Sequence, residues 1–449
     1  MKPRSSAAPA TTSTAEHCFP ETDVMTARFP VHGKRVALLG TSLVQQNHHA
    51  GERHIRSSAR GWATWAEVLS HGQLDVTVFH DPLVYPGWEP SGRVGTTRGF
   101  GGLNAGVSGQ KARDIANRID EVLKLDFDLI IIDAGTNDMM VETKEVIQAV
   151  REKIVDRILS AGRQVILLPI LARGTQKWSA GGSERAKAHW INQKSLAFAA
   201  SRPGCHVFDW NAPWVDWHSA DGVPRDGFSD DGTHFSVPGG YAVGKALAEY
   251  LRVFLAPSRP RTWSRDDRFH SVDNPLGNLL SNPLLNGSGP LADGLVIPEI
   301  RHVLSNQVIS RPDRSANWQE VSLARGECFA EILGEDFINP LPAGAWVQAS
   351  CEVEVDAHDG WREISLILKD GGPEGLTSQA LAPFNLAEQS LAPFPHEAWS
   401  GVLKTPPIKL KTPRHSLQLR LSLQLELSDR PGMMRFSTPE LRQVEAPIS

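Results

Sequence analysis

Cysteine is scarce in this chain, with four residues in 449, and their spacing excludes several classes of protein. The four are Cys18, Cys205, Cys328 and Cys351. They include no Cys-x-x-Cys pair, so zinc-finger spacing is absent, and a disulfide framework would be denser. We therefore expect buried free thiols. A Cys328–Cys351 pair facing each other on neighbouring strands is the alternative.

Long apolar runs and an excess of basic residues are also missing. No stretch approaches about 18 uninterrupted apolar residues, so no membrane-spanning helix is expected. The formal net charge is -5, which offers no basic stripe for nucleic acid. Residues 1–33 lack the apolar segment of a secretory signal and predict a disordered arm. We therefore expect a cytoplasmic protein, or one exported by a non-standard route.

The length of the chain predicts two domains, because it exceeds what one hydrophobic core usually supports. Short apolar segments alternate with amphipathic helices over residues 34–253. Residues 254–275 are dense in Pro, Arg and Asp and predict a linker. Residues 276–449 follow a period of two, which indicates a second domain made of strands.

The first domain is predicted to be an α/β fold with a doubly wound parallel sheet and helices on both faces. The segment Leu129–Ile132 is continuously apolar, as in a central strand that is covered on both faces. Ser236 is expected to cap a last helix that runs through Leu251. The expected strands are Arg35–Leu39, Leu74–Phe79, Asp128–Asp133, Gln164–Ile170 and His206–Trp210.

The second domain is predicted to be an all-β antiparallel sandwich. Apolar residues alternate with polar ones in several segments without helices between them. They are Leu417, Leu419, Leu421, Leu423, Leu425 and Leu427, then Cys351, Val353 and Val355, then Ile364, Leu366 and Leu368. The segments near Asn278 and Trp318 are loosely similar to jelly-roll modules that are appended to carbohydrate-active proteins.

The ends of the first domain carry the residue types that acyl transfer requires. Ser42 follows an apolar strand on a predicted strand-to-helix turn, and Asp231 and His234 stand three positions apart near the end of the domain. A serine hydroxyl attacks an ester when an imidazole takes its proton and a carboxylate orients that imidazole. Asp230 and Asp226 are neighbouring alternatives to Asp231.

Each of these residues also has a purely structural interpretation. Ser42 could cap a helix, His234 could be an exposed loop histidine, and Asp231 could form a turn beside Gly232. A second cluster, His48, His49 and His54, lies in a polar segment after Ser42. It lacks helical spacing and supporting carboxylates, so we expect no metal there.

Four sequence blocks together resemble the SGNH (GDSL-type) hydrolases over residues 34–253. They are Gly40-Thr41-Ser42-Leu43, Asn104 to Gly109, Gly135-Thr136-Asn137-Asp138 and Asp231-Gly232-Thr233-His234. The resemblance implies a flavodoxin-like sheet, a catalytic triad of Ser42, Asp231 and His234, and an oxyanion hole of Ser42, Gly109 and Asn137. This chain departs from the family at Thr41, where the family has Asp.

This resemblance implies a serine esterase that uses an acyl-enzyme and needs no cofactor or metal. The expected partner is a small-molecule or polysaccharide acyl ester, with deacetylation of an O-acylated carbohydrate as the leading expectation. Trp178 and Trp214 are the candidates to stack on a sugar ring, with core packing as the alternative. The alternatives are an acyltransferase with the same residues, or a non-catalytic glycan-binding or structural protein with a relic hydrolase domain. The oligomeric state stays open.

Overall fold

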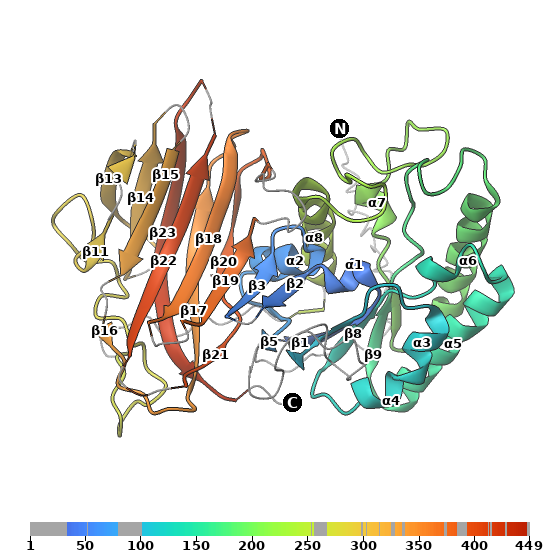
Figure 1. Cartoon of the computed structure of the whole chain (residues 1–449), viewed down its shortest axis with the longest axis horizontal. Helices are drawn as coiled ribbons and strands as arrows, with labels where there is room; N and C mark the ends of the chain where they lie inside the picture. Colours follow the sequence, from blue (N-terminus) through green and yellow to red (C-terminus); the bar gives the residue numbers. More distant parts are fainter. Residues whose placement is uncertain are drawn as a thin grey trace, which may run out of the picture.

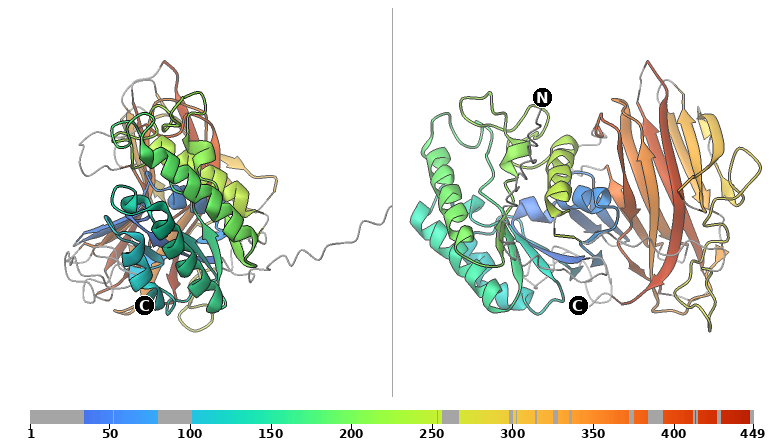
Figure 2. Two further views of the ribbon diagram at one scale, coloured as in Figure 1. Left: turned by 90° about the vertical axis from the view of Figure 1, so that its right-hand side faces the viewer. Right: turned by 180° about the vertical axis from the view of Figure 1, so that it is seen from behind.

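The computed structural model describes residues 34–51, 53–79, 101–252, 254–255, 267–297, 300–301, 303–313, 315–324, 328–334, 337–371, 375–383, 393–411, 413, 415–426 and 429–446. The expected N-terminal arm and residues 256–266 of the expected linker lie outside these ranges. Figure 1 shows an α/β half and a β half side by side, and Figure 2 shows the same two halves from behind.

A parallel sheet forms the centre of the α/β half. Its strand order is β10-β9-β8-β1-β4, with β7 also paired to β1. In chain order this is the flavodoxin-like arrangement 2-1-3-4-5, which confirms the predicted fold class. The strands are β1 (Lys34–Gly40), β4 (Leu74–Asp75), β7 (Asn104–Gly106), β8 (Leu129–Ile132), β9 (Gln164–Leu167) and β10 (Cys205–Val207). The expected strand Leu74–Phe79 is broken, because β5 (Val78–Phe79) pairs instead with β6 (Gly101–Gly102).

Helices cover both faces of this sheet. On one face, Leu38 and Ile131 pack with Trp62 and Leu247, and on the other face Leu39 and its neighbours pack with a separate set of helices. The continuous apolar run of β8 follows from this double cover. Ser236 accepts a hydrogen bond from Gly239 N–H, which confirms the predicted cap of α8. The helices are α1 (Ser42–Gln45), α2 (Trp62–Leu69), α3 (Ala112–Asn117), α4 (Ile119–Val122), η1 (Thr136–Asp138), α5 (Lys144–Ser160), α6 (Ser183–Ala200), α7 (Asn211–Trp214) and α8 (Val237–Leu251).

The β half is a sandwich of two sheets, as the period of two predicts. The first has the order β11-β15-β22-β18-β19-β3-β2, with β12 and β16 at its side, and the second has the order β13-β14-β23-β17-β20, with β21. Their strands are β2 (His48–Gly51), β3 (His54–Ser58), β11 (Leu295–Val296), β12 (Ile300–Arg301), β13 (Val303–Ser310), β14 (Asn317–Leu323), β15 (Cys328–Gly334), β16 (Phe337–Ile338), β17 (Trp346–Val355), β18 (Trp361–Asp370), β19 (Thr377–Ala382), β20 (Trp399–Lys404), β21 (Ile408–Lys409), β22 (Ser416–Leu425) and β23 (Gly432–Val444).

The alternating residues of the sequence form the core between these two sheets. All five leucines from Leu417 to Leu425 are buried, while Leu427 lies outside the described residues. The alternating residues of β17 and β18 are buried as well, including the thiol of Cys351, which is free. Cys328 and Cys351 lie on strands of different sheets, so they are not neighbours in a ladder.

The two halves share a sheet. The polar segment that holds His48, His49 and His54 forms the hairpin β2–β3, and β3 pairs in parallel with β19 of the sandwich. The end of the expected linker is also built into the sandwich, where Asp267 accepts a hydrogen bond of 3.0 Å from Arg442. The α/β half therefore contributes two strands to the sandwich.

Helices α2 and α8 lie between the parallel sheet and the sandwich (Figure 1). Trp62 faces the parallel sheet, whereas Trp65 faces the sandwich and packs edge-to-face on Trp399 at 5.2 Å. A helix with apolar residues on both sides is expected where it is buried between two layers. The buried Trp65 ring of α2 thus makes aromatic contacts across the boundary between the halves.

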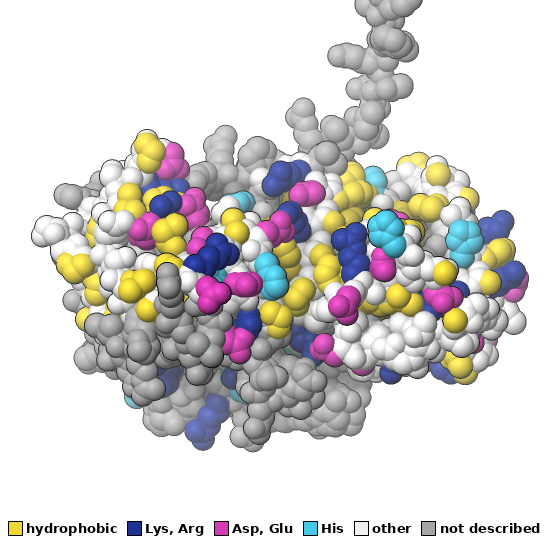
Figure 3. All heavy atoms as spheres, turned by 90° about the horizontal axis from the view of Figure 1, so that it is seen from above, with side chains coloured by type: hydrophobic (Ala, Val, Ile, Leu, Met, Phe, Trp, Pro, Cys, Tyr) yellow, Lys and Arg dark blue, Asp and Glu magenta, His cyan; other side chains and the backbone are white. Residues whose placement is uncertain are grey.

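No helix within the described ranges is long and apolar enough to cross a bilayer. On the face in Figure 3, the side chains of Lys and Arg lie among those of Asp and Glu and do not gather into one stripe.

Candidate active site

Ser42 begins α1 immediately after β1, at the carboxyl edge of the parallel sheet. Thr41 has extended backbone angles and caps the helix, and its Oγ1 accepts a hydrogen bond from Leu43 N–H at 3.4 Å. Gly40 precedes this turn. A Cβ at Gly40 would lie 2.8 Å from the carbonyl oxygen of Asp133, so only glycine fits. The turn therefore presents the serine where parallel sheets usually bind ligands.

A chain of hydrogen bonds joins Ser42, His234 and Asp231. His234 Nε2 lies 2.8 Å from Ser42 Oγ, and His234 Nδ1 lies 2.8 Å from Asp231 Oδ2. An ionised carboxylate can only accept hydrogen bonds, so Nδ1 is the nitrogen that carries the proton. In the neutral ring Nε2 is then the acceptor, and the serine hydroxyl donates a hydrogen bond to it.

The carboxylate of Asp231 is fixed by its own loop. Its Oδ1 accepts hydrogen bonds from the backbone N–H of His234 at 2.8 Å and of Thr233 at 2.9 Å. Partial burial alone would raise the pKa of Asp231, but these donors and the His234 ring together lower it well below its usual value. The neighbouring Asp230 faces away toward Arg60, 3.6 Å from its guanidinium.

Gly109 lies in the loop that follows β7, and Asn137 lies in η1, within the loop that follows β8. The loop after β7 is tied to β1, because Val107 N–H donates to the Gly40 carbonyl at 2.9 Å. Gly109 is exposed on this loop with φ of +79°, which glycine adopts readily. Asn137 Nδ2 donates to the carbonyl of Gln110 at 2.9 Å, which joins the second loop to the first. Its amide nitrogen has a second hydrogen to donate.

Asp138 has a structural position, at the end of η1. Its carboxylate accepts a hydrogen bond of 2.9 Å from Ala112 N–H, at the first residue of α3. Met140 and Val141 follow in the chain and are strongly exposed.

Asp133 lies beside the nucleophile turn and was not singled out in the sequence. Its carboxylate accepts a hydrogen bond of 2.6 Å from the Thr41 hydroxyl, and both residues are completely buried. Burial raises the pKa of Asp133, opposed by the Thr41 hydrogen bond and the nearby Arg151 and Arg173. Asp133 directly follows the apolar run of β8, and this position at the carboxyl end of a strand is the sequence feature that points to it.

Arg173 is a second residue that the sequence reasoning missed. Its guanidinium donates to Thr136 Oγ1 at 2.7 Å and to Thr233 Oγ1 at 3.4 Å. Thr136 precedes Asn137, and Thr233 precedes His234. Arg173 therefore links the loop of the oxyanion candidate to the loop of the candidate base.

Trp178 and Trp214 do not offer open ring faces for a sugar. Trp214 is completely buried, packs on Phe235 at 4.6 Å and donates from its ring to the Ala172 carbonyl. Trp178 is 3% exposed and packs in a cluster with Ile147. The expectation of sugar stacking at these two positions is corrected, because core packing occupies both rings.

The three histidines after Ser42 lie on the β2–β3 hairpin. His48 Nδ1 lies 2.9 Å from Asn104 Nδ2, whereas the rings of His49 and His54 stack on each other at 5.3 Å. His48 thus faces away from the other two. Within the described ranges, no group of three or more His, Cys, Asp or Glu side chains has a metal-binding arrangement.

The flavodoxin-like sheet carries Ser42, His234 and Asp231 in hydrogen-bond series, which is the arrangement that serine hydrolases use. Residues 38–242 match the model of the GDSL-like lipase/acylhydrolase family, and this part of the chain is a GDSL-like hydrolase domain. No curated protein matches the sequence.

Solved structures similar to this chain include hydrolases and a sugar-binding module. A carbohydrate esterase family 3 structure from Talaromyces cellulolyticus is 19% identical, covering 49% of this chain and 96% of that one, with a TM-score of 0.33. A GDSL-like lipase from Bacteroides thetaiotaomicron is 17% identical, covering 50% and 92%, with a TM-score of 0.33. A β-sandwich carbohydrate-binding module is 10% identical, covering 33% and 57%, with a TM-score of 0.24.

Proposed function

We propose that residues 34–253 act as a serine esterase through a covalent acyl-enzyme. The observation that carries this proposal is the unbroken hydrogen-bond chain from Ser42 through His234 to Asp231, with both distances at 2.8 Å. In this proposal Ser42 is the nucleophile, His234 is the general base and Asp231 holds the imidazole in the required tautomer.

The first half of the reaction forms the acyl-enzyme. His234 Nε2 takes the hydroxyl proton as Ser42 Oγ attacks the ester carbonyl, and Asp231 stabilises the imidazolium. The oxyanion receives hydrogen bonds from the N–H groups of Ser42 and Gly109 and from the Asn137 amide. One such donor is worth about 2.7–4 kcal/mol of the barrier. The C–O bond then breaks, and the imidazolium gives its proton to the leaving alkoxide.

The second half of the reaction releases the acid. His234 takes a proton from a water molecule, whose oxygen attacks the acyl carbonyl on Ser42. The intermediate collapses, the proton returns to Ser42 Oγ, and the carboxylic acid leaves. His234 thus carries the proton in both halves of the reaction.

For the alcohol part of the substrate we propose an O-acylated carbohydrate, with acetyl as the acyl group. The support is the architecture, in which a β-sandwich is joined to the hydrolase domain through a shared sheet. The chemistry of the Ser42 site does not itself select a sugar alcohol.

A substitution at the nucleophile tests the esterase. Ser42→Ala should lower kcat/KM for p-nitrophenyl acetate by at least about 10⁴-fold, because the attacking atom is removed. Its thermal unfolding should match the wild type, which checks the fold. Residual activity close to the wild type would reject the assignment.

Acetate release from O-acetylated polysaccharides tests the carbohydrate part separately. The wild type should release acetate from at least one of them, and Ser42→Ala should not. If the enzyme cleaves p-nitrophenyl acetate and none of the polysaccharides, the proposed sugar substrate is wrong while the esterase stands.

A further inference from the structure

A cavity of about 130 Å³ lies inside the sandwich, between its two sheets. The nine-stranded sheet contributes Leu366, Leu419 and Leu421, and the opposite sheet contributes Cys351 and Phe436. Protein interiors are close-packed, and voids larger than a water molecule are few. A hollow of this size between the two sheets, which also reaches the surface, therefore calls for an explanation.

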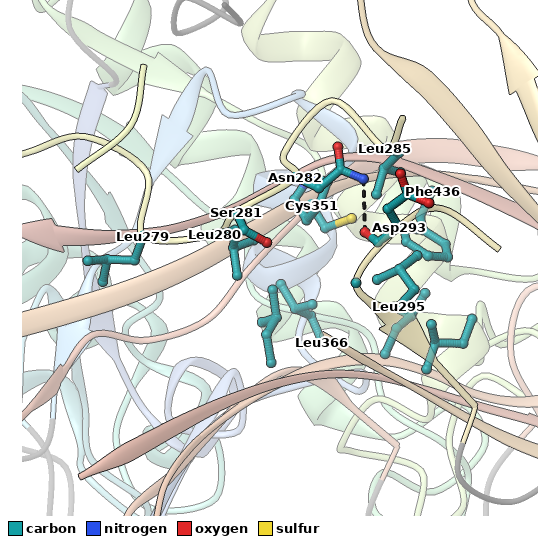
Figure 4. A pocket seen from close by; sticks show the side chains of 15 residues that line it. Leu279, Leu280, Ser281, Asn282, Leu285, Asp293, Leu295, Cys351, Leu366 and Phe436 are labelled. Carbon is teal, nitrogen blue, oxygen red and sulfur yellow. Dashed lines mark hydrogen bonds between the residues drawn. The ribbon is translucent and has the colours of Figure 1, made fainter. Parts of the chain in front are cut away.

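The cavity arises where a small side chain faces a row of leucines. Leu366 and Leu421 are register partners on β18 and β22, and both are buried. Cys351 lines the cavity from the opposite sheet, and its side chain is much shorter than the leucines (Figure 4). At the first residue of β18, Trp361 fills the core so tightly that a Cβ at Gly432 would lie 3.0 Å from its ring. The hollow is thus local.

The lining accepts apolar groups and disfavours charge. Among the described residues that line it, Asp293 is the charged one, and it is exposed at the rim. The thiol of Cys351 is satisfied inside, because it donates to the Ser437 carbonyl at 3.4 Å. A charged group buried without a partner is strongly disfavoured, whereas apolar surface gains from leaving water.

A loop over residues 279–295 forms the remaining wall, and its exposed residues Ser281 and Asp293 bring the cavity to the surface. Asn282 fixes this loop, because its amide donates to the Asn286 carbonyl at 2.7 Å and to the Asp293 carbonyl at 2.9 Å (Figure 4). Leu285 is buried against the cavity with φ of +52°, a conformation that is unfavourable for leucine. Strained residues of this kind gather at ligand-binding sites.

We propose that this cavity binds one small uncharged apolar group, either a single aromatic ring or an alkyl chain of about six carbons. An apolar cavity of roughly 150 Å³ lined by Leu, Ile and Phe stays dry and takes up benzene or xenon. The described lining comes from residues 279–439 and includes none of the α/β domain. The site is therefore separate from Ser42, and the proposal does not depend on the esterase.

Benzene and benzoate give a matched pair of probes for the full chain. Benzene should raise the unfolding temperature with the logarithm of its concentration, because binding raises the folded-to-unfolded ratio by a factor of 1 + [L]/Kd. Benzoate carries the same ring with a charge and should cause no shift. Absence of a benzene shift, or an equal shift with benzoate, overturns the proposal.

Two variants on β17 locate the site. Cys351→Leu fills the cavity and should abolish the benzene shift. Val353→Leu lies two residues further on the same buried face, outside the lining, and should keep the shift. An undiminished shift in Cys351→Leu refutes the assignment. Xenon-pressurised crystals of the wild type provide a test without a variant, because xenon density should appear among Leu366, Leu419 and Phe436, and its absence there contradicts the proposal.

Discussion

Thr41 and Asp133 form a buried hydrogen-bonded pair beside the candidate nucleophile Ser42. The chain departs from the SGNH pattern at Thr41, which cannot carry a charge. The structure nevertheless has a carboxylate at this turn, because Asp133, which follows β8, accepts a hydrogen bond of 2.6 Å from the Thr41 hydroxyl. The other oxygen, Asp133 Oδ1, is buried and has no hydrogen-bond partner among the described residues. The Thr41 hydroxyl is therefore an important donor to a buried acid.

A pair of substitutions at Thr41 tests this interaction. Thr41→Val should lower the free energy of unfolding by about 1–3 kcal/mol, because it leaves a buried oxygen without its donor. Thr41→Ser keeps a hydroxyl and should lose much less. Urea denaturation of both variants measures the difference, and equal stability of the two would show that the hydrogen bond contributes nothing.

The β2–β3 hairpin is the decisive element between the nucleophile and the sandwich. It begins at His48, six positions after Ser42. Asn47, just before it, is completely buried, and its side chain donates to the Val44 carbonyl and accepts from Ala63 N–H. These bonds hold α1, the hairpin and α2 together at one residue. The position of Ser42 is thus coupled through backbone to the sheet of the sandwich.

His48 makes this element sensitive to acid. Burial lowers the pKa of His48 to about 3 in the folded protein, from 6.5, and its Nδ1 accepts a hydrogen bond from the Asn104 amide. Between pH 6.5 and about pH 3, His48 is protonated in the unfolded chain and neutral in the folded protein. The folded state therefore loses stability as the pH falls through this range.

Replacing the histidine should remove this loss. Between pH 7 and about pH 5, the contribution of His48 to the free energy of unfolding should fall by about 2 kcal/mol in the wild type. His48→Gln should lack this dependence of stability on pH. His218 is exposed, and His218→Gln is the control that should keep the wild-type slope. Urea denaturation at both pH values decides, and identical slopes for the wild type and His48→Gln would contradict the account.

At the scale of the whole molecule, buried charge joins the two halves. Lys404 of the sandwich lies 2.6 Å from Glu67 and 2.9 Å from Asp75 of the α/β half. Burial alone would lower the pKa of Lys404, but the two carboxylates raise it, so the amine stays charged. Lys245 and Glu397 form a second pair between the halves at 2.8 Å, and it is exposed.

These two pairs form a matched comparison. Lys404→Met should lower the free energy of unfolding by about 3 kcal/mol, because it leaves the buried Glu67 carboxylate and the half-buried Asp75 carboxylate without their cation. Lys245→Met breaks the exposed pair and should cost less than about 1 kcal/mol. If both variants lose the same stability in urea, the buried cluster does not hold the halves together.

The sequence predicts features that depend on local patterns. The apolar run Leu129–Ile132 indicates a central strand, and the alternating leucines of β22 indicate a strand with one buried face; both predictions are confirmed. The hairpin could not be predicted in this way. Residues 48–58 are polar, and β3 forms a strand because its backbone pairs with Thr377–Ala382, more than three hundred positions away.

In the candidate site, too, residues in local motifs can be predicted from the sequence, whereas residues that act across the fold cannot. Ser42, Asp231 and His234 stand in short motifs, so the sequence points to them before their distances are known. Asp133 and Arg173 act across strands and loops, and their partners become visible only when the fold brings them together. Trp178 and Trp214 show the converse case, because a sequence does not reveal which face of an aromatic ring the core covers.

Labelling of Ser42 by a fluorophosphonate tests the central claim most directly, because only an activated serine reacts with this probe. The wild type should take up one equivalent, with the adduct mapped to the peptide that contains Ser42 by mass spectrometry. His234→Ala should react much more slowly, since the hydroxyl loses the acceptor that lies 2.8 Å away. A wild-type protein without an adduct on Ser42, or one that labels no faster than His234→Ala, would contradict the account.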